Sequence, residues 1–361
     1  MFKKFNRILF LSLATLMTAG GCKQIYDVPD ERDYISPRAD FTRKDFGGET
    51  DFVLGRTTMT QSSEFNSDNS TFPLNFEVVN VRFGDGTPTQ DILKVKSVLV
   101  WTAPYTGQEK TLAEIDAKRK TEEHPIFEIR PSGQFILWNS SRAEDLKKAD
   151  GSLAVVDSDY LAPQNRRFFD VKLSNSGGER IIRNFSINLY RERAYEPSRD
   201  LEPLTGKLTG TYNHPSIVNR IYGTLTKSYL SSEAVDVYMK KVGAGRSLTF
   251  KFWNRDSSTI NPDNFNLTKW DQQVHGFNMV KDSTHVKYDV AFPIPLAKLP
   301  TIYTGGRLSS GDEARVLFEF SRRKGKIVES GSLGYNFKIF EEGDWEIIFH
   351  FKTDNPKFED E

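Results

Sequence analysis

The sequence is poor in the residues that most often build metal and redox sites, with one cysteine and five histidines in 361 residues. A single cysteine cannot form a disulfide within the chain or a cluster of zinc-binding thiolates. The histidines are scattered, and none has a His or Cys partner at ligand spacing: His124, His214, His275, His285 and His350. We therefore expect no zinc site and no cofactor, and a fold stabilised by packing alone.

The motifs of common catalytic sites are also missing. The chain has no Gly-x-Ser-x-Gly nucleophile turn, no Gly-x-x-x-x-Gly-Lys-Ser/Thr phosphate loop and no His-Glu-x-x-His zinc helix. Gly243-Ala-Gly245 lacks the third glycine and the following helix of a dinucleotide site. These absences predict a protein that is not an enzyme. A glycoside hydrolase stays open as an alternative, because its two carboxylates can come from anywhere among 49 acidic residues.

Neither sign of charge is in excess, since 49 Lys and Arg residues face 49 Asp and Glu residues. Without residues 1–21 the balance becomes 46 against 49. Nucleic acids and strongly anionic surfaces are bound through clustered Lys and Arg residues. The sequence shows no such cluster, so we expect no nucleic-acid partner.

The first 22 residues have the layout of a lipoprotein signal peptide. Three basic residues precede an uncharged stretch at 8–17, which is about half as long as a helix that spans a bilayer. Ala19-Gly20-Gly21 then places small residues directly before Cys22, as a bacterial lipobox does, although Leu is usual where Ala19 stands. We predict that Cys22 carries a diacylglycerol anchor that attaches the protein to a membrane. Ordinary signal-peptide cleavage without a lipid is the alternative.

The remaining chain is longer than one hydrophobic core usually supports. About 340 residues follow the signal peptide, against a limit of about 250–300 for a single core. A mixed-charge stretch with two prolines, Glu196 to Pro203, favours a domain boundary. The expected organisation is a signal peptide (1–21), a lipidated tether and irregular lead-in (22–72), an N-terminal β domain (73–195), a linker (196–206) and a C-terminal β domain (207–361).

Alternation of apolar and polar residues, the spacing of a half-buried strand, dominates from Leu74 onward. One hairpin is predicted over residues 127–137, and a closing hairpin over residues 335–351 with one dry and one largely wet face. Long crossover helices of a parallel α/β fold are not visible. The fold class is therefore predicted to be mainly β, with two antiparallel β-sandwich-like domains and a few short helices.

Two further local patterns refine this picture. The continuous apolar run from Val95 to Trp101 predicts a strand that is covered on both faces. Capping boxes at Thr111–Glu114 and Ser141–Glu144 predict two short helices, because a Thr or Ser side chain can accept the free amide three residues on. Both helices are expected to connect strands.

The five tryptophans are the main hint of a ligand, since a flat exposed ring can stack on the apolar face of a sugar. Trp138 and Trp345 fall in strand patterns and are expected in the core. Trp253 lies on the polar face of its strand, and Trp270 lies in a polar, loop-like stretch, so these two are the main candidates for glycan contact. Trp101 is the third candidate. A buried or edge-capping role is the alternative for each.

Acidic residues near turns raise the question of a structural calcium ion. Asp85, and Asp157 with Asp159, offer carboxylate oxygens of the kind that calcium prefers. Both places have too few ligands, and Asp-Gly pairs commonly form turns. The turn interpretation is therefore favoured over calcium.

Together with the lipobox, the segments Val78–Pro88 and Phe127–Trp138 and the C-terminal strand pattern resemble a family of uncharacterised Bacteroidota surface lipoproteins. The acidic group after Cys22 resembles their surface-export signal, with an ordinary linker as the alternative. The resemblance implies an outward-facing outer-membrane protein that partners SusC-like transporters and SusD-like lipoproteins in nutrient uptake. It carries over no functional residue except Cys22. We expect a noncatalytic, glycan-binding lipoprotein, with a structural or adhesive surface protein as the alternative.

Overall fold

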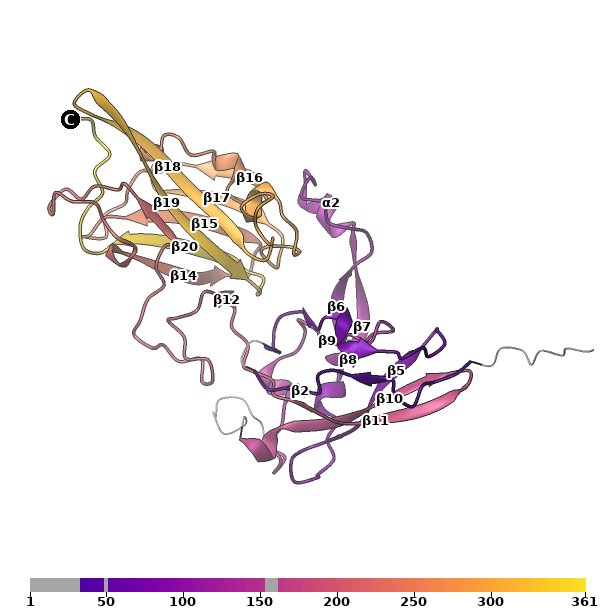
Figure 1. The fold of residues 1–361 in the computed structure, drawn as a ribbon. Coiled ribbons are helices and arrows are strands. Elements are labelled where there is room, and N and C mark those ends of the chain that lie inside the picture. Colours follow the sequence, from indigo (N-terminus) through magenta and orange to yellow (C-terminus); the bar gives the residue numbers. More distant parts are fainter. Residues whose placement is uncertain (1–32, 49–50, 153–161) are drawn as a thin grey trace, which may run out of the picture.

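The computed structural model describes residues 33–48, 51–152 and 162–361, and these are organised mainly as β-strands (Figure 1). They form several open, mostly antiparallel sheets, which confirms the predicted β-sandwich-like class. No helix in the described ranges is long and apolar enough to cross a membrane. Cys22, the predicted lipid site, lies outside the described residues.

The elements follow one another along the chain with short helical turns between them. The strands are β1 (Asp40–Phe41), β2 (Asp45–Phe46), β3 (Thr58–Met59), β4 (Phe65–Asn66), β5 (Asn75–Arg82), β6 (Val95–Trp101), β7 (Arg119–Pro125), β8 (Phe127–Ile129), β9 (Phe135–Leu137), β10 (Arg167–Asn175), β11 (Gly178–Ile187), β12 (Tyr195–Glu196), β13 (Ile217–Asn219), β14 (Val235–Gly243), β15 (Ser247–Trp253), β16 (Gly276–Lys281), β17 (His285–Val290), β18 (Ala314–Lys324), β19 (Ile327–Ile339) and β20 (Asp344–Phe351). The helix α2 spans Leu112–Asp116, and the 3-10 turns are η1 (Ser62–Glu64), η2 (Asp91–Leu93), η3 (Ala143–Asp145), η5 (Pro163–Asn165), η6 (Ser232–Ala234), η7 (Pro262–Asn264), η8 (Trp270–Gln272) and η9 (Ile302–Thr304).

The N-terminal body, comprising the described residues up to 189, has a core built from phenylalanine rings. Its sheets have the strand orders β2-β11-β10-β5, β3-β9-β8 and β1-β4. Phe135 lies at the centre of this core, with ring centroids 5.3–5.7 Å from those of five other rings: Phe41, Phe46, Phe127, Phe169 and Phe185. The predicted 127–137 hairpin is confirmed as β8–β9, and Gly133 at its turn has φ +79°. A non-glycine residue would be strained there.

The predicted tether and lead-in at 22–72 is wrong from residue 33 on. Ala39, Phe41, Phe46 and Leu54 are all buried in the N-terminal core. Strands β1 to β4 lie in this segment, and each is only two residues long. Such short strands leave no alternating pattern in the sequence, because their burial depends on partners such as β11 that come much later in the chain.

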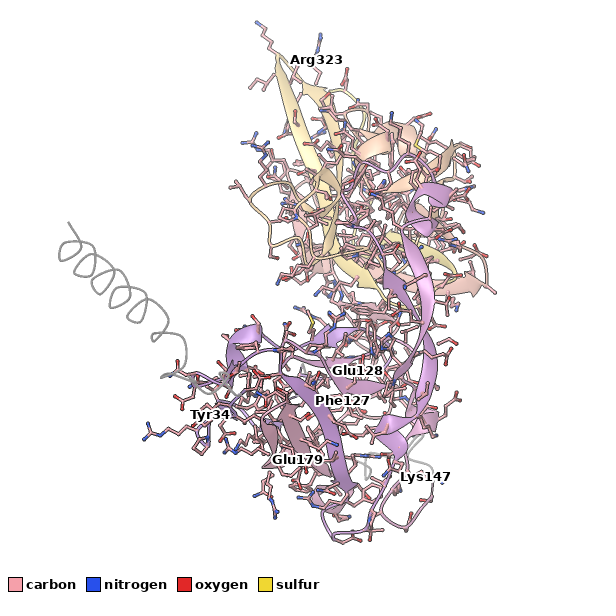
Figure 2. All side chains as sticks on the ribbon, turned by 90° about the vertical axis from the view of Figure 1, so that its right-hand side faces the viewer. Tyr34, Phe127, Glu128, Lys147, Glu179 and Arg323 are labelled. Atoms are coloured by element: carbon pink, nitrogen blue, oxygen red, sulfur yellow. The ribbon has the colours of Figure 1, made fainter. Side chains whose placement is uncertain are left out.

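The C-terminal body, residues 190–361, is a two-layered sandwich. One layer has the strand order β14-β20-β15-β17-β16, and the other contains β18, β19, β12 and β13. Phe318 of β18 reaches across, with its ring centroid 5.5 Å from that of Phe250 in β15 and 5.4 Å from that of Phe349 in β20. The β18–β19 hairpin is the longest, with paired residues from Ala314↔Phe337 to Lys324↔Ile327. Figure 2 places Arg323, near its tip, at the far end of this body from the N-terminal body.

The predicted closing hairpin at 335–351 is wrong in its pairing, although the dry face is correct. The seven alternating hydrophobic residues from Tyr335 to Phe351 are buried as expected. However, β20 pairs with β14 and β15, while β19 pairs with β18, β12 and β13, so the chain crosses from one layer to the other at Gly343. Since β20 is a central strand, Ile348 and His350 on its other face are also buried. Alternation of apolar and polar residues specifies which face of a strand is buried, but not which other strands it pairs with.

Three local predictions need comment. The first capping box is confirmed, because Thr111 Oγ1 accepts the Glu114 amide at 3.1 Å at the start of α2. The second is shifted by one residue: Asp145 accepts the Arg142 amide at 2.9 Å, and only the 3-10 turn η3 follows. The predicted linker at 196–206 begins inside β12, where Glu196 pairs with Lys338, and the change of core falls between Leu189 and Tyr195.

An arm comprising β6, α2 and β7 leaves the N-terminal body and reaches the C-terminal body (Figure 1). It is a two-stranded sheet in which Val95, Leu99 and Trp101 are exposed, so the predicted double coverage of this strand is wrong. At its tip, Ile115 is fully buried against Ala291 and Leu296. The arm therefore forms a second connection between the bodies, in addition to the chain around residue 190.

Candidate functional site

A groove of about 720 Å³ lies where the arm meets the two bodies. The N-terminal body contributes residues 55–59 and Asn139, the arm contributes residues 99–101 and Arg119, and the C-terminal body contributes residues 292–298. Binding sites occur preferentially in hollows between structural units, where several segments can contact one ligand. This groove is therefore the leading candidate for a binding site.

Trp101 supplies the exposed aromatic ring of the groove. It retains 36% of its surface, because it ends a strand of a sheet that has only two strands. Its ring centroid is 5.8 Å from that of Tyr105, and the Arg119 guanidinium lies over the ring at 5.4 Å. The cation and the neighbouring ring hold the indole in place. A fixed flat ring with free surface is suited to stack on a sugar.

The opposite part of the groove contains cationic side chains from both bodies. Arg56 Nη1 donates to Glu196 at 2.7 Å, and its guanidinium lies 4.3 Å from the Phe340 ring centroid. Burial lowers the pKa of Arg56, although the Glu196 carboxylate counteracts this. Lys338 approaches the same carboxylate at 3.9 Å. Arg56 and Lys338 are far apart in sequence, so only the fold brings them together.

The arm joint beside the groove is fixed by a partly buried chain of hydrogen bonds. Tyr105 Oη is 2.5 Å from His275 Nδ1, and His275 Nε2 is 2.7 Å from the Glu109 carbonyl oxygen. The Glu109 carbonyl can only accept, so Nε2 carries the imidazole hydrogen and donates to it. Nδ1 then accepts from the Tyr105 hydroxyl, whose pKa is raised by burial. Histidine here positions the arm, and this function had no signal in the sequence.

Trp270 is not available as a stacking surface. It lies in η8 with 9% of its surface exposed, and its ring centroid is 5.4 Å from that of Phe318. The prediction of glycan contact is wrong for this residue, because the polar neighbours in sequence lie outside while the indole points into the core. Trp138 and Trp345 are buried at 6% and 2%, as expected.

Trp253 lies outside the groove, on the outer face of the five-stranded sheet. It is half-buried, its ring centroid is 5.7 Å from that of His350, and Lys240 Nζ lies 5.9 Å from the ring. Tyr238 is adjacent to His350 on the same face, with ring centroids 6.0 Å apart. Trp253 and Trp101 thus belong to separate surfaces, and Trp101 is the one that lines the groove.

The metal predictions can be placed only in part. Asp85 Oδ1 accepts the Thr87 amide at 2.8 Å in a turn in which Gly86 has φ +88°, so this residue has the turn role. Asp157 and Asp159 lie outside the described residues. Within the described ranges, no three His, Cys, Asp or Glu side chains converge as a metal site.

The comparisons place the chain in a family without assigning a function. No curated protein and no solved structure matches it. The model of one uncharacterised family covers residues 65–360, which include the arm, the C-terminal body up to Asp360 and the N-terminal body from β4 onward. The chain therefore belongs to the family described as Domain of unknown function (DUF5007).

Proposed function

We propose that this protein is a noncatalytic, lipid-anchored binding protein of the outer membrane that holds a glycan in the groove between its two bodies. The observation that carries the proposal is Trp101, a partly exposed indole held in place beside Arg119 in a groove of about 720 Å³. Asn139 and Arg130 line the same groove and can donate hydrogen bonds to sugar hydroxyls. An aromatic surface bordered by polar donors is what a sugar requires.

The acidic side chains support a binding role over hydrolysis. Among the described lining residues, Asp312 is the one carboxylate, and it pairs with Lys298 at 2.9 Å. Most glycoside hydrolases need two carboxylates on either side of the scissile bond. The groove thus offers surface and donors rather than an acid pair.

Localisation and partners belong to the same proposal. Diacylglycerol on Cys22 would anchor the protein to the outer membrane facing outward, and a SusC/SusD-type uptake complex would receive the glycan. The signal-peptide pattern and the lipobox support the anchor. Mass spectrometry of the mature N-terminus tests it: we expect acylated Cys22, and an unmodified N-terminus would overturn this part.

Affinity electrophoresis on polysaccharide gels tests binding with the chain from residue 23. We expect retention on at least one polysaccharide, and loss of retention with Trp101→Ala. Trp253→Ala is the matched control, because that ring lies on the outer sheet face. Retention that depends on Trp253 and not on Trp101 would move the site to that face, and no retention on any polysaccharide would overturn glycan binding.

An alternative function, adhesion to other proteins, is favoured by one edge strand. β16 ends the five-stranded sheet, and Met279 and Val280 on it are 44% and 56% exposed. Exposed apolar edge strands can pair with a strand of another chain. Val280→Lys should abolish such contacts and leave glycan retention unchanged, as a pull-down with the full mature chain would show.

A further inference from the structure

We infer that the glycan held in the groove is acidic, carrying carboxylate or sulfate groups. This inference rests on the proposed function and specifies its ligand class. The described lining residues include five cationic side chains and one carboxylate: Arg56, Arg119, Arg130, Lys298 and Lys338 against Asp312. The whole chain is balanced at 49 against 49, so the fold concentrates positive charge at this place.

Ion pairs within the protein leave part of this charge uncompensated. Lys298 is neutralised by Asp312 at 2.9 Å, and Arg119 by Asp116 at 2.5 Å. Asp116 also accepts two hydrogen bonds from Arg246, so one carboxylate serves two guanidinium groups, and Glu342 is a more distant second counterion of Arg246 at 4.0 Å. Like-charged groups that share one counterion favour the entry of another anion.

Arg56 and Lys338 show the same shortage on the side of the C-terminal body. Both approach the Glu196 carboxylate, at 2.7 Å and 3.9 Å. Arg56 Nε and Nη2 are buried and have no hydrogen-bond partner among the described residues. These two nitrogens are closed to a ligand in this conformation, so Arg56 contributes its positive charge to the groove rather than hydrogen bonds.

Arg130 is the most accessible cation of the groove. It is exposed next to the β8–β9 turn, and its guanidinium makes a weak contact from Nη1 to Met59 Sδ at 3.8 Å. No carboxylate of the described residues lies within ion-pair distance of it. A guanidinium that is free in the protein can pair bidentately with a carboxylate or sulfate group of a ligand.

The arrangement joins these charges to the stacking surface. Arg119 lies over Trp101, and its Nη1 donates to the Phe292 carbonyl at 2.8 Å, so the guanidinium cannot move away. A sugar ring on Trp101 would have Arg119 beside it and other cations further along the groove. A neutral sugar gains no electrostatic attraction from this excess positive charge. An acidic polysaccharide with a negative charge on successive residues is attracted by each cation along the groove.

Affinity electrophoresis with matched polysaccharides tests the inference. The acidic probes are polygalacturonate, alginate and chondroitin sulfate, and the neutral probes are fully methyl-esterified polygalacturonate, galactomannan and starch. We expect retention on at least one acidic probe, at least fivefold weaker retention on every neutral one, and weakening in 0.5 M salt because charges are screened. Arg130→Ala and Lys338→Ala should each weaken acidic retention at least fivefold.

The control is Arg323→Ala, which removes one positive charge at the far tip of the β18–β19 hairpin (Figure 2). Equal loss with Arg323→Ala and Arg130→Ala would show ion exchange by the whole surface and overturn the inference. Retention on neutral probes only, abolished by Trp101→Ala, would overturn the acidic ligand and leave the proposed function intact. No retention on any probe would overturn the proposed function itself.

Discussion

The two bodies reach a dry core by different means. The C-terminal body uses long strands, with 11 residues in β18 and 13 in β19, whose alternate side chains face one interior. The N-terminal body combines three strands of 8–10 residues, β5, β10 and β11, with several strands of only two or three residues, and these meet around the ring of Phe135. Long strands prescribe their buried face locally, whereas short strands depend on contacts between distant segments. The N-terminal body should therefore be the more sensitive to loss of a single central ring.

Removing the central rings provides the strongest test of this difference. Phe135→Ala and Phe318→Ala each leave a cavity in a full core, which costs about 3–5 kcal/mol. Phe135→Ala should lower hydrogen-exchange protection throughout the N-terminal body, and Phe318→Ala mainly in the strands next to it. Uniform loss of protection in both bodies with either variant would show that they unfold as one unit.

The buried ion pair of the N-terminal body gives the next largest effect. Arg167 and Asp91 are 2.7 Å apart, and each side chain is 2% exposed. Asp91→Ala leaves the guanidinium buried without its counterion, which costs about 3 kcal/mol or more. Glu77→Ala is the matched control, because Glu77 pairs with Lys172 at the surface with 58% of its side chain exposed, and such pairs contribute about 0–1 kcal/mol. Urea unfolding of both variants measures the difference.

The C-terminal body has its own buried carboxylate, at Asp354. Burial opposes ionisation, but hydrogen bonds from Thr226, Leu225 and Thr224 outweigh it and lower the pKa of Asp354 to about 2. A carboxyl group with a lowered folded-state pKa stabilises the protein above its unfolded pKa of about 4. That stabilisation is lost as the pH falls toward 2. Asp354→Asn should cost about 2 kcal/mol at pH 7, since hydrogen bonds to a charged group are lost.

The pH profile checks this assignment. The difference in unfolding free energy between the parent chain and Asp354→Asn should shrink as the pH falls from 5 to 2. A constant difference over that interval would mean that the Asn side chain disturbs packing and that the charge contributes little. Hydrogen exchange should localise the change to the loop at residues 223–226.

The smallest effect is expected at the joint between arm and C-terminal body. Arg246 donates to Asp116 at 2.8 Å and 3.0 Å, but 44% of the Asp116 side chain is exposed. Arg246→Ala should therefore cost less than about 1 kcal/mol. Faster exchange of arm amides, with both cores unchanged, would show that the joint opens separately from the bodies. If the arm amides exchanged more slowly than the amides of either core, separate opening of the joint would be contradicted.

The sequence predicts the C-terminal strands well and the candidate site poorly. The burial of residues such as Val237, Phe250 and Phe318 is predictable, because other apolar residues lie two positions away on the same face of the strand. The burial of Trp270 is not predictable in this way, because it depends on the core ring of Phe318 against which the indole packs. The exposure of Trp101 depends on β6 belonging to a sheet of only two strands. The positive charge of the groove cannot be predicted from the sequence either, because Arg56 and Lys338 are far apart in the chain and come together only after folding.

The arm also sets the order in which the protein can be completed during synthesis. Its hydrogen bonds to the C-terminal body join residues separated by 130 to 173 positions along the chain, as in Arg246–Asp116 and Arg119–Phe292. While the N-terminal body emerges first, the apolar tip around Ile115 has no cover. Until residues near 300 are synthesised, Ile115 lacks the apolar partners that bury it, and the groove between the arm and the C-terminal body is incomplete. The groove is therefore among the last features of the described structure to form, because it needs segments of both bodies.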